Sequence, residues 1–243
     1  MIFKILAMKT ARFFTEFSLV SLLVLSPACS DKDNKPEGKK DIWDIEKDGI
    51  PQFVETNYIE LDKISRISKF RSSIGHDYSD VFEDCRSMKH YFEPKSTIDW
   101  GSVKVCSPVS GTVTRVEQES AGTKVEIASD DYPAFRFSVF HIYLTAQLSV
   151  NDKVSAGQQL GTHIGSQTMS DISVIVNDPT RQGRMISWFE VITDEVFEEY
   201  AAGGVNARED LIIPKETRDA NPLTCNGEAF VSQDLLENWV VLN

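Results

Sequence analysis

Short runs rich in β-branched and aromatic residues follow one another between residues 103 and 193, and turn-forming residues separate them. Such runs favour strands, because these side chains fit a pleated, half-buried surface. The pattern predicts strands at residues 103–106, 111–116, 124–128, 135–142, 159–164, 171–176 and 185–192. Many short strands at this spacing indicate a barrel or a sandwich.

Two helices are expected after these strands. Residues 194–202 place Val196, Phe197 and Tyr200 on one face, begin with acidic residues and end before two glycines, as a short amphipathic helix does. A second short helix is predicted at residues 233–240, whereas residues 205–231 show no regular pattern. We therefore expect a mainly β fold of short antiparallel strands with a few peripheral helices.

An apolar run at residues 17–25 follows Lys9 and Arg12. A membrane-spanning helix needs about 20 apolar residues, so this shorter run is typical of a secretory signal. The segment Leu-Ser-Pro-Ala-Cys-Ser around Cys29 resembles a bacterial lipoprotein cleavage site. We predict a signal peptide at residues 1–28 and lipidation of Cys29, which would anchor the protein to a membrane in the cell envelope. Export without a lipid is the alternative.

The residues that follow are polar and bury too little surface to fold alone. We predict a flexible tether at residues 29–50, a β domain at residues 51–200 and a C-terminal extension at residues 201–243 packed on that domain. The chain has a net charge of −12, which becomes about −14 when the signal peptide is removed. No basic run suits phosphates, so we expect no nucleic-acid partner.

Export also determines what the cysteines can do. If Cys29 is acylated, Cys85, Cys106 and Cys225 remain in an oxidising compartment, where disulfides persist. Three cysteines allow one bridge, and the sequence leaves the three pairings open. No Cys-x-x-Cys spacing is present, so a zinc site made of cysteines is not expected.

Two segments carry a more specific pattern. Residues 107–113 read Ser-Pro-Val-Ser-Gly-Thr-Val, and residues 150–161 read Val-Asn-Asp-Lys-Val-Ser-Ala-Gly-Gln-Gln-Leu-Gly. Gly111 and Gly157 fit tight turns between strands, and the valines alternate into a small core. Together the segments resemble barrel-sandwich hybrid domains, which include lipoyl and biotinyl carriers, efflux adaptors and the lysostaphin-type zinc endopeptidases that cut peptidoglycan cross-bridges.

Further residues favour the lysostaphin-type family, and the resemblance covers roughly residues 70–177. His76 and Asp80 match the family's His-x-x-x-Asp, which supplies two zinc ligands. His141 lies in Val-Phe-His-Ile, which is similar to the family's Tyr-x-His-Leu strand, whose histidine assists catalysis. The resemblance therefore implies a lysostaphin-like β domain, a zinc ion, His76 and Asp80 as metal ligands and His141 as a catalytic residue.

The chain departs from the family in the closing strand. The family has His-x-His there, whereas this sequence has Asp171-Ile172-Ser173, and a serine is a poor zinc ligand. His163 is a candidate for the missing ligand. Asp171 is a candidate catalytic residue that either binds the metal or orients a histidine. A zinc site needs three firm protein ligands, and the sequence supplies only His76 and Asp80. Zinc affinity should therefore fall below that of a dedicated site.

Each candidate also has a structural interpretation. Asp80 could cap a helix at residues 81–91, with Glu83 three positions later, and His76 could be a loop residue. His141 shares its expected strand face with Phe135, Phe137 and Val139, so it could belong to the core, and His163 could face solvent.

Three functional hypotheses follow. The favoured one is an envelope-tethered, lysostaphin-like domain with an incomplete zinc site that binds or regulates peptidoglycan or an envelope partner. The second is an active zinc metalloendopeptidase with a rearranged ligand set, so the sequence leaves open whether the protein is an enzyme. The third, a carrier or adaptor barrel, is disfavoured because Lys153 is poorly placed for a lipoyl group and no long heptad hairpin is present.

Overall fold

A computed structural model describes residues 39–243. The predicted signal peptide, the lipidation site Cys29 and the first part of the tether lie outside the described residues. None of the helices in the described part has the length and apolar character needed to cross a membrane.

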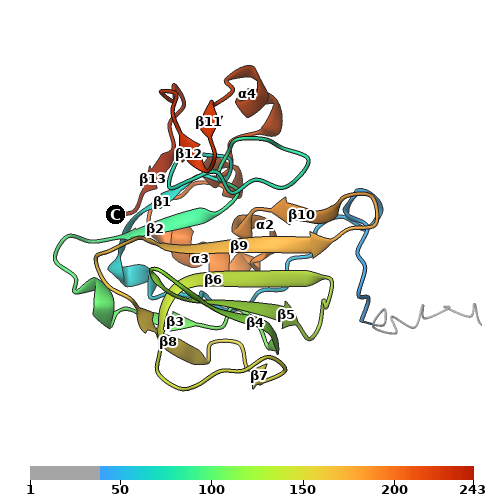
Figure 1. The fold of residues 1–243 in the computed structure, drawn as a ribbon, viewed down its shortest axis with the longest axis vertical. Coiled ribbons are helices and arrows are strands. Elements are labelled where there is room, and N and C mark those ends of the chain that lie inside the picture. Colours follow the sequence, from blue (N-terminus) through green and yellow to red (C-terminus); the bar gives the residue numbers. More distant parts are fainter. Residues whose placement is uncertain (1–38) are drawn as a thin grey trace, which may run out of the picture. The chain divides into compact units, whose positions relative to one another are not determined.

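An eleven-stranded antiparallel sheet forms most of the fold, and a two-stranded hairpin lies apart from it (Figure 1). Along the sheet the strand order is β13-β1-β2-β9-β6-β5-β4-β7, with β10 beside β9 and with β8 beside β6 and β3. The sheet strands are β1 Ile64–Ser68, β2 His90–Pro94, β3 Lys104–Cys106, β4 Gly111–Glu119, β5 Gly122–Ser129, β6 Phe135–Leu144, β7 Lys153–Val154, β8 Gln159–His163, β9 Ser170–Asn177, β10 Gln182–Ile186 and β13 Trp239–Val241. The hairpin strands are β11 Cys225–Asn226 and β12 Ala229–Phe230.

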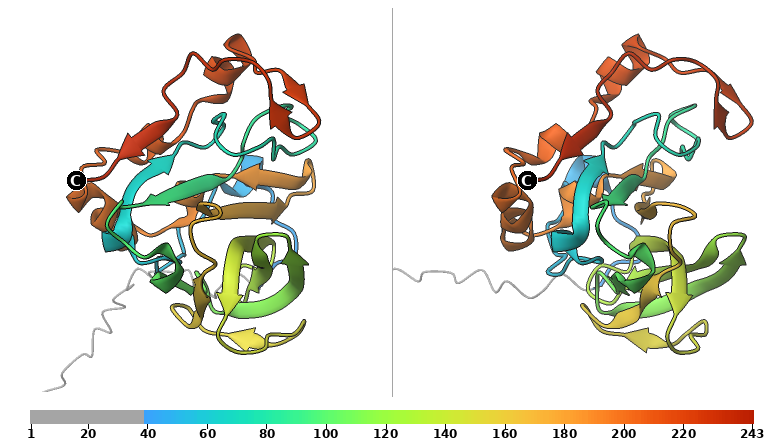
Figure 2. Two further views of the ribbon diagram at one scale, coloured as in Figure 1. Left: turned by 60° about the vertical axis from the view of Figure 1, so that its left-hand side comes forward. Right: turned by 90° about the vertical axis from the view of Figure 1, so that its left-hand side faces the viewer.

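The helices are short. They are α1 Ile45–Asp48, α2 Trp188–Val191, α3 Asp194–Ala202 and α4 Lys215–Ala220, with single 3₁₀ turns at Leu61–Lys63, Trp100–Ser102 and Arg208–Leu211. The expected mainly β fold with few peripheral helices is therefore confirmed. The strands from β4 to β8 curve into a rounded wall, which the left view of Figure 2 shows in green and yellow.

Two predicted elements are wrong. The strand expected at residues 185–192 ends at Ile186, because Ser187 begins helix α2 with a capping box: its hydroxyl accepts from Phe189 N–H, and the Glu190 carboxylate accepts from Ser187 N–H. Such reciprocal caps favour a helix over the strand preference of the aromatic residues. The helix expected at residues 233–240 is absent from the described residues. Its last residues pair with β1 as strand β13 instead, whereas the helix at residues 194–202 is confirmed as α3.

The central pair of strands, β6 and β9, separates two environments. Phe135, Phe137 and Val139 on β6 lie opposite Val176, Val174 and Ile172 on β9, and all six side chains are buried. Trp188 packs edge-on against Phe137 at a ring distance of 6.2 Å. This face of the strand pair therefore belongs to the main hydrophobic core.

Residues assigned to the tether by their polarity take part in this packing. The Trp43 N–H donates to the Asn177 carbonyl at 3.0 Å, and its ring meets Phe135 edge-on at 6.0 Å. Ile45 is buried within the short helix α1. Together with the ion pair between Glu46 and Arg184, these contacts hold residues 43–48 against the domain.

One disulfide, Cys85–Cys225, ties the C-terminal extension to the connection between β1 and β2, with 5.7 Å between the Cα atoms. Among the described residues, Cys106 is the free cysteine and is half-buried. The structure thus selects one of the three pairings that the sequence left open. A disulfide of this kind is consistent with an oxidising, extracytoplasmic compartment.

Candidate functional site

A buried ion pair lies on the other face of the β6–β9 strand pair. Asp171 projects from β9 and is 0% exposed, and its Oδ2 accepts a hydrogen bond from Lys89 Nζ at 2.7 Å. Lys89 immediately precedes β2, and its side chain is 2% exposed. Burial raises the pKa of Asp171, but the Lys89 ammonium and His141 outweigh it and hold that pKa below its usual range. Asp171 is therefore an anion inside the protein.

His141 completes this charge cluster, which we define as Lys89, Asp171 and His141. Its Nδ1 lies 2.8 Å from the Ala121 carbonyl oxygen. Its Nε2 lies 3.0 Å from Asp171 Oδ1, close enough for an ion pair, although the angles do not meet the criteria for a hydrogen bond. Both neighbours only accept, so both ring nitrogens need a proton. Burial lowers the pKa of His141, but Asp171 and Ala121 outweigh burial and raise it overall.

A β-bulge aims His141 at Asp171. Strand β6 pairs with β9 as far as Val139 and with β8 from Ile142 onward, and the register against β5 shifts over the same residues. His141 has a φ of +60°, a strained conformation for a residue other than glycine. The sequence interpretation that placed His141 on the apolar face with Phe137 is therefore wrong, because the extra residue interrupts the alternation.

Aromatic rings enclose the Lys89 ammonium. It lies 3.9 Å from the Phe140 ring centre and 4.2 Å from that of Tyr78, distances at which the ring faces attract a cation. Burial raises the pKa of Tyr78 to about 12, so the phenol is neutral. The ammonium therefore has a carboxylate and two ring faces among its neighbours and meets almost no solvent.

His76 lies at the outer edge of the charge cluster. Its Nδ1 donates to the Asp77 carbonyl at 3.0 Å, and its Nε2 lies 3.4 Å from Lys89 Nζ, where it can only accept. Glu228, from the C-terminal extension, lies 3.6 Å from Nδ1. The sequence proposed His76 as a metal ligand and Asp171 as a catalytic residue. In the structure both side chains instead contact the Lys89 ammonium.

Asp80 lies in different surroundings. One carboxylate oxygen accepts from Phe82 N–H at 2.9 Å and the other from Met185 N–H at 3.0 Å. No contact joins Asp80 to His76 or His141 among the described residues. No helix follows it at residues 81–91 either, so the carboxylate supports a turn and fixes the end of β10.

His163 lies between the charge cluster and a groove. Its ring is 4.3 Å from the Trp100 ring and 6.3 Å from that of His141, and its Nδ1 accepts from Gly165 N–H at 3.1 Å. Burial lowers the pKa of His163 to about 4, so the ring is neutral. His163 is 1% exposed, so it does not face solvent.

These donors do not fit a zinc ion. Zinc needs three or four protein ligands at about 2.0–2.2 Å. Lys89 already neutralises Asp171, Asp80 binds two backbone N–H groups elsewhere, and Ser173 offers only a hydroxyl. Within residues 39–243 there is no group of three or more His, Cys, Asp or Glu side chains arranged to hold a metal ion.

Lys89 is the site residue that the sequence did not reveal. A lysine before a strand has no motif, and its burial depends on Tyr78, Phe140 and Asp171, which come from three separate segments.

The groove lies beside the end of β2 and the start of β9. Its volume is about 670 Å³, and it is lined by the segment from Glu93 to Trp100 and by residues 166–169. Trp100 closes one wall and donates from its indole N–H to the Thr168 carbonyl at 2.9 Å. The row of rings from Trp100 through His163 to His141 therefore leads from the groove to the charge cluster.

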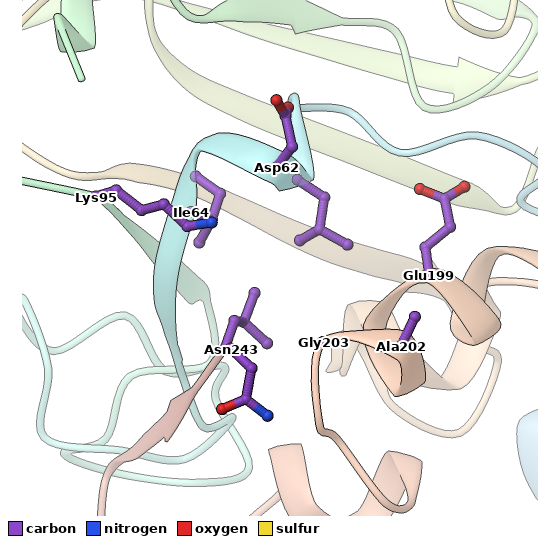
Figure 3. Close-up of a pocket in the computed structure, with 9 residues that line it drawn as sticks. Asp62, Ile64, Lys95, Glu199, Ala202, Gly203 and Asn243 are labelled. Atoms are coloured by element: carbon purple, nitrogen blue, oxygen red, sulfur yellow. The ribbon is translucent and has the colours of Figure 1, made fainter. Parts of the chain in front are cut away.

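A second hollow, of about 330 Å³, contains none of the candidate site residues. Lys95 and Glu199 approach it from opposite sides, and Asp62 and Asn243 complete its polar lining (Figure 3). It lies between the start of β1 and the end of α3, so we assign it no role in the site.

Comparisons with known proteins found similar solved structures. No protein-family model and no curated protein sequence matches the chain. Among solved structures, the SpoIIQ–SpoIIIAH pore-forming complex is similar at 15% identity and a TM-score of 0.41, covering 61% of this chain and 97% of that one. Csd3 of Helicobacter pylori is similar at 18% identity and a TM-score of 0.42, covering 79% of this chain and 45% of that one.

The catalytic domain of the antimicrobial peptidase lysostaphin from Staphylococcus simulans is also similar, at 16% identity and a TM-score of 0.34. The match covers 46% of this chain and 81% of that one. The structural neighbours are thus lysostaphin-type peptidases and SpoIIQ, all at low sequence identity. Because these sequence identities and TM-scores are low, the functional proposal rests on the residues of the site itself.

Proposed function

We propose that this protein is an exported domain of the cell envelope that binds peptidoglycan peptides without hydrolysing them. The observation that carries the proposal is the Lys89 ammonium, 2.7 Å from Asp171 and 3.4 Å from His76. A metallopeptidase needs a metal that polarises the scissile carbonyl and activates water. A buried ammonium held by a carboxylate and two rings supplies neither, so the charge cluster stabilises the domain and does not act on a substrate.

The groove provides the binding surface. Glu93, Lys95 and Asp99 give its walls both signs of charge, and Ile98 and Met169 add apolar surface. This mixture suits a short peptide that carries free amines and carboxylates. A strongly acidic chain is less suited to anionic polymers, since its net charge of −12 repels them.

The predicted signal peptide and lipid on Cys29 would hold this domain at a membrane, within reach of the cell wall. The predicted tether would then set the distance between the membrane and the groove. An envelope protein that presents a peptide segment is the alternative ligand of the same groove.

Zinc analysis tests the absence of hydrolysis. Purified full-length protein is incubated with zinc, washed with a weak chelator and analysed by atomic emission, and its action on muropeptides is followed by mass spectrometry. We expect less than one tightly held zinc per chain and no cleavage. One retained zinc, together with cleavage that His76→Ala abolishes, would establish the active-enzyme hypothesis instead.

Calorimetric titration with soluble muropeptides tests the binding. Gln167→Arg places a bulky cation on the exposed wall of the groove, and Gln182→Arg makes the same change at an exposed position on β10. We expect the first variant to weaken binding at least about tenfold and the second to leave it unchanged. Equal affinities of both variants would place the ligand outside the groove, and no binding by the wild type would favour an envelope protein as the partner.

A further inference from the structure

Residues 73–86, within the connection between β1 and β2, cover the charge cluster, and we call them the cover loop. Tyr78 places its ring 4.2 Å from the Lys89 ammonium, and His76 approaches the same group at 3.4 Å. Lys89 is 2% exposed under this loop. If the loop moved away, the ammonium would lose one of its ring faces and meet solvent.

A hairpin of the C-terminal extension, residues 224–231, lies on the cover loop (Figure 1). The disulfide joins Cys225 of the hairpin to Cys85 of the loop. One backbone hydrogen bond accompanies it, from Asp77 N–H to the Glu228 carbonyl at 2.7 Å. The hairpin also places the Glu228 carboxylate 3.6 Å from His76.

Packing contributes little to holding this hairpin. None of its residues 224–231 is buried, so it gains little free energy from apolar contacts. The chain on either side is held without the disulfide. Arg218 is fully buried and binds both carboxylate oxygens of Asp234, and β13 pairs with β1. The attachment of the hairpin therefore depends mainly on one covalent bond.

The disulfide is placed where it can react. Cys85 and Cys225 are both half-buried, which leaves the bond within reach of an attacking thiolate. Cys85 also has a φ of +53°, a backbone conformation that costs free energy in a residue other than glycine. Release of the loop would let Cys85 leave this conformation.

We propose that Cys85–Cys225 is a redox-sensitive latch that keeps the charge cluster covered. A dithiol reductant attacks the disulfide, forms a mixed disulfide with one cysteine and then closes its own disulfide. The two electrons and two protons pass to Cys85 and Cys225, which become thiols. The hairpin then leaves the cover loop, and Lys89 becomes accessible. The latch acts on the charge cluster and not on the groove, so it goes beyond the proposed function.

Amine labelling of folded protein tests the latch. Full-length protein, oxidised or treated with dithiothreitol, is acetylated briefly at neutral pH, and the modification of each lysine is measured by peptide mass spectrometry. We expect reduction, or Cys225→Ser, to raise the labelling rate of Lys89 at least about tenfold, because its exposure depends on local opening. Lys153, whose side chain is 66% exposed, should react at the same rate in every sample and serves as the internal standard.

Two controls separate a latch from an ordinary structural disulfide. Hydrogen exchange of Gly122–Ser129 in β5 reports on the main core and should stay unchanged on reduction. Glu228→Ala removes the carboxylate beside His76 but keeps the disulfide, so Lys89 should stay protected. Unchanged Lys89 labelling in a chain with free Cys85 and Cys225, or loss of core protection together with labelling, would overturn the proposal. The proposed function fails on a different result, the absence of peptide binding in both redox states.

Discussion

The two faces of the β6–β9 strand pair have opposite chemistry. On one face, Phe137 and Val174 lie opposite each other and join the main core. On the other face, Ser138 lies opposite Ser173, and Asp171 binds Lys89 beneath the cover loop. Both faces are buried, yet one is stabilised by the removal of apolar surface from water and the other by a few paired charges.

This difference determines how each face should respond to substitution. Apolar packing is spread over many contacts, so the loss of one methyl group removes a limited share of the stabilisation. A buried ion pair concentrates its effect in two or three groups, and the removal of one partner leaves a charge without compensation. Substitutions on the polar face should therefore lower the free energy of unfolding more than substitutions on the apolar face, and their effects should be less additive.

Asp171→Asn should have the largest effect. The substitution keeps the size of the side chain but leaves the Lys89 ammonium and the protonated His141 buried without a counter-charge. The breaking of a buried pair in this way costs about 3–5 kcal/mol, which urea denaturation would measure. Ser173→Ala, two residues later on the same strand face, is the matched control and should cost less than about 1 kcal/mol. A loss for Asp171→Asn no larger than that of the control would refute the assigned role of the ion pair.

Lys89→Met comes next, at about 2–3 kcal/mol, because Asp171 keeps His141 as a partner. The double variant Lys89→Met/Asp171→Leu removes both members of the pair and fills their space with apolar groups. Because the replacement of a complete buried pair is often neutral or stabilising, the double variant should be more stable than Lys89→Met alone. Simple addition of the losses of Lys89→Met and Asp171→Leu in a double-mutant cycle would show that the charges act independently.

The apolar face was predictable from the sequence, and the polar face was predictable only in part. Alternating branched and aromatic residues such as Phe135, Phe137 and Val139 locate strands because burial of one face imposes a period of two. The capping box at Ser187 and Glu190 is also encoded locally, but it lies within a run of strand-forming residues that masked it. The pairing of Trp239 in β13 with Ser68 in β1 depends on a strand that is distant in the sequence, so no local sequence pattern predicts it.

The candidate site shows the same limit. His76, His141 and Asp171 were singled out by the resemblance to lysostaphin-type domains, and the structure places His76 and Asp171 beside Lys89 and His141 beside Asp171. Their roles stay predictions. Neither Lys89 nor the bulge at His141 follows from local pattern, because a buried lysine is defined by partners far away in the chain and a bulge by the register of its neighbours.

Gly75→Ala should have an intermediate effect by disturbing the cover loop. A Cβ atom at position 75 would overlap the ring of Tyr91, and the φ of +77° disfavours any side chain. Gly183 has a φ of +76° with open space around it, so Gly183→Ala measures the backbone cost alone, about 1 kcal/mol. We expect Gly75→Ala to lose about 2 kcal/mol and its thermal transition to fall further than that of the control. Equal shifts would show that the loop adapts to the extra methyl group.

The smallest expected effect is the dependence of stability on pH, and it separates the histidines of the polar face. The pKa of His141 is raised in the folded state, so its contribution is complete below the unfolded pKa of about 6.5 and is lost as the pH rises through the folded value. The pKa of His163 is lowered to about 4. Its contribution is therefore present above about 6.5 and is lost as the pH falls toward 4.

His141→Asn isolates the first of these two contributions. The difference in unfolding free energy between wild type and variant, measured in urea from pH 5 to 9, should be largest at the acidic end and should shrink with rising pH. NMR titration of the imidazole protons should give His141 a higher pKa than the two buried rings, His90 and His163, whose values of about 4 follow from burial. A difference that grows with rising pH would mean that His141 is neutral in the folded protein, and Lys89 would then be the sole counter-charge of Asp171; a constant difference would mean that folding leaves the pKa of His141 unchanged.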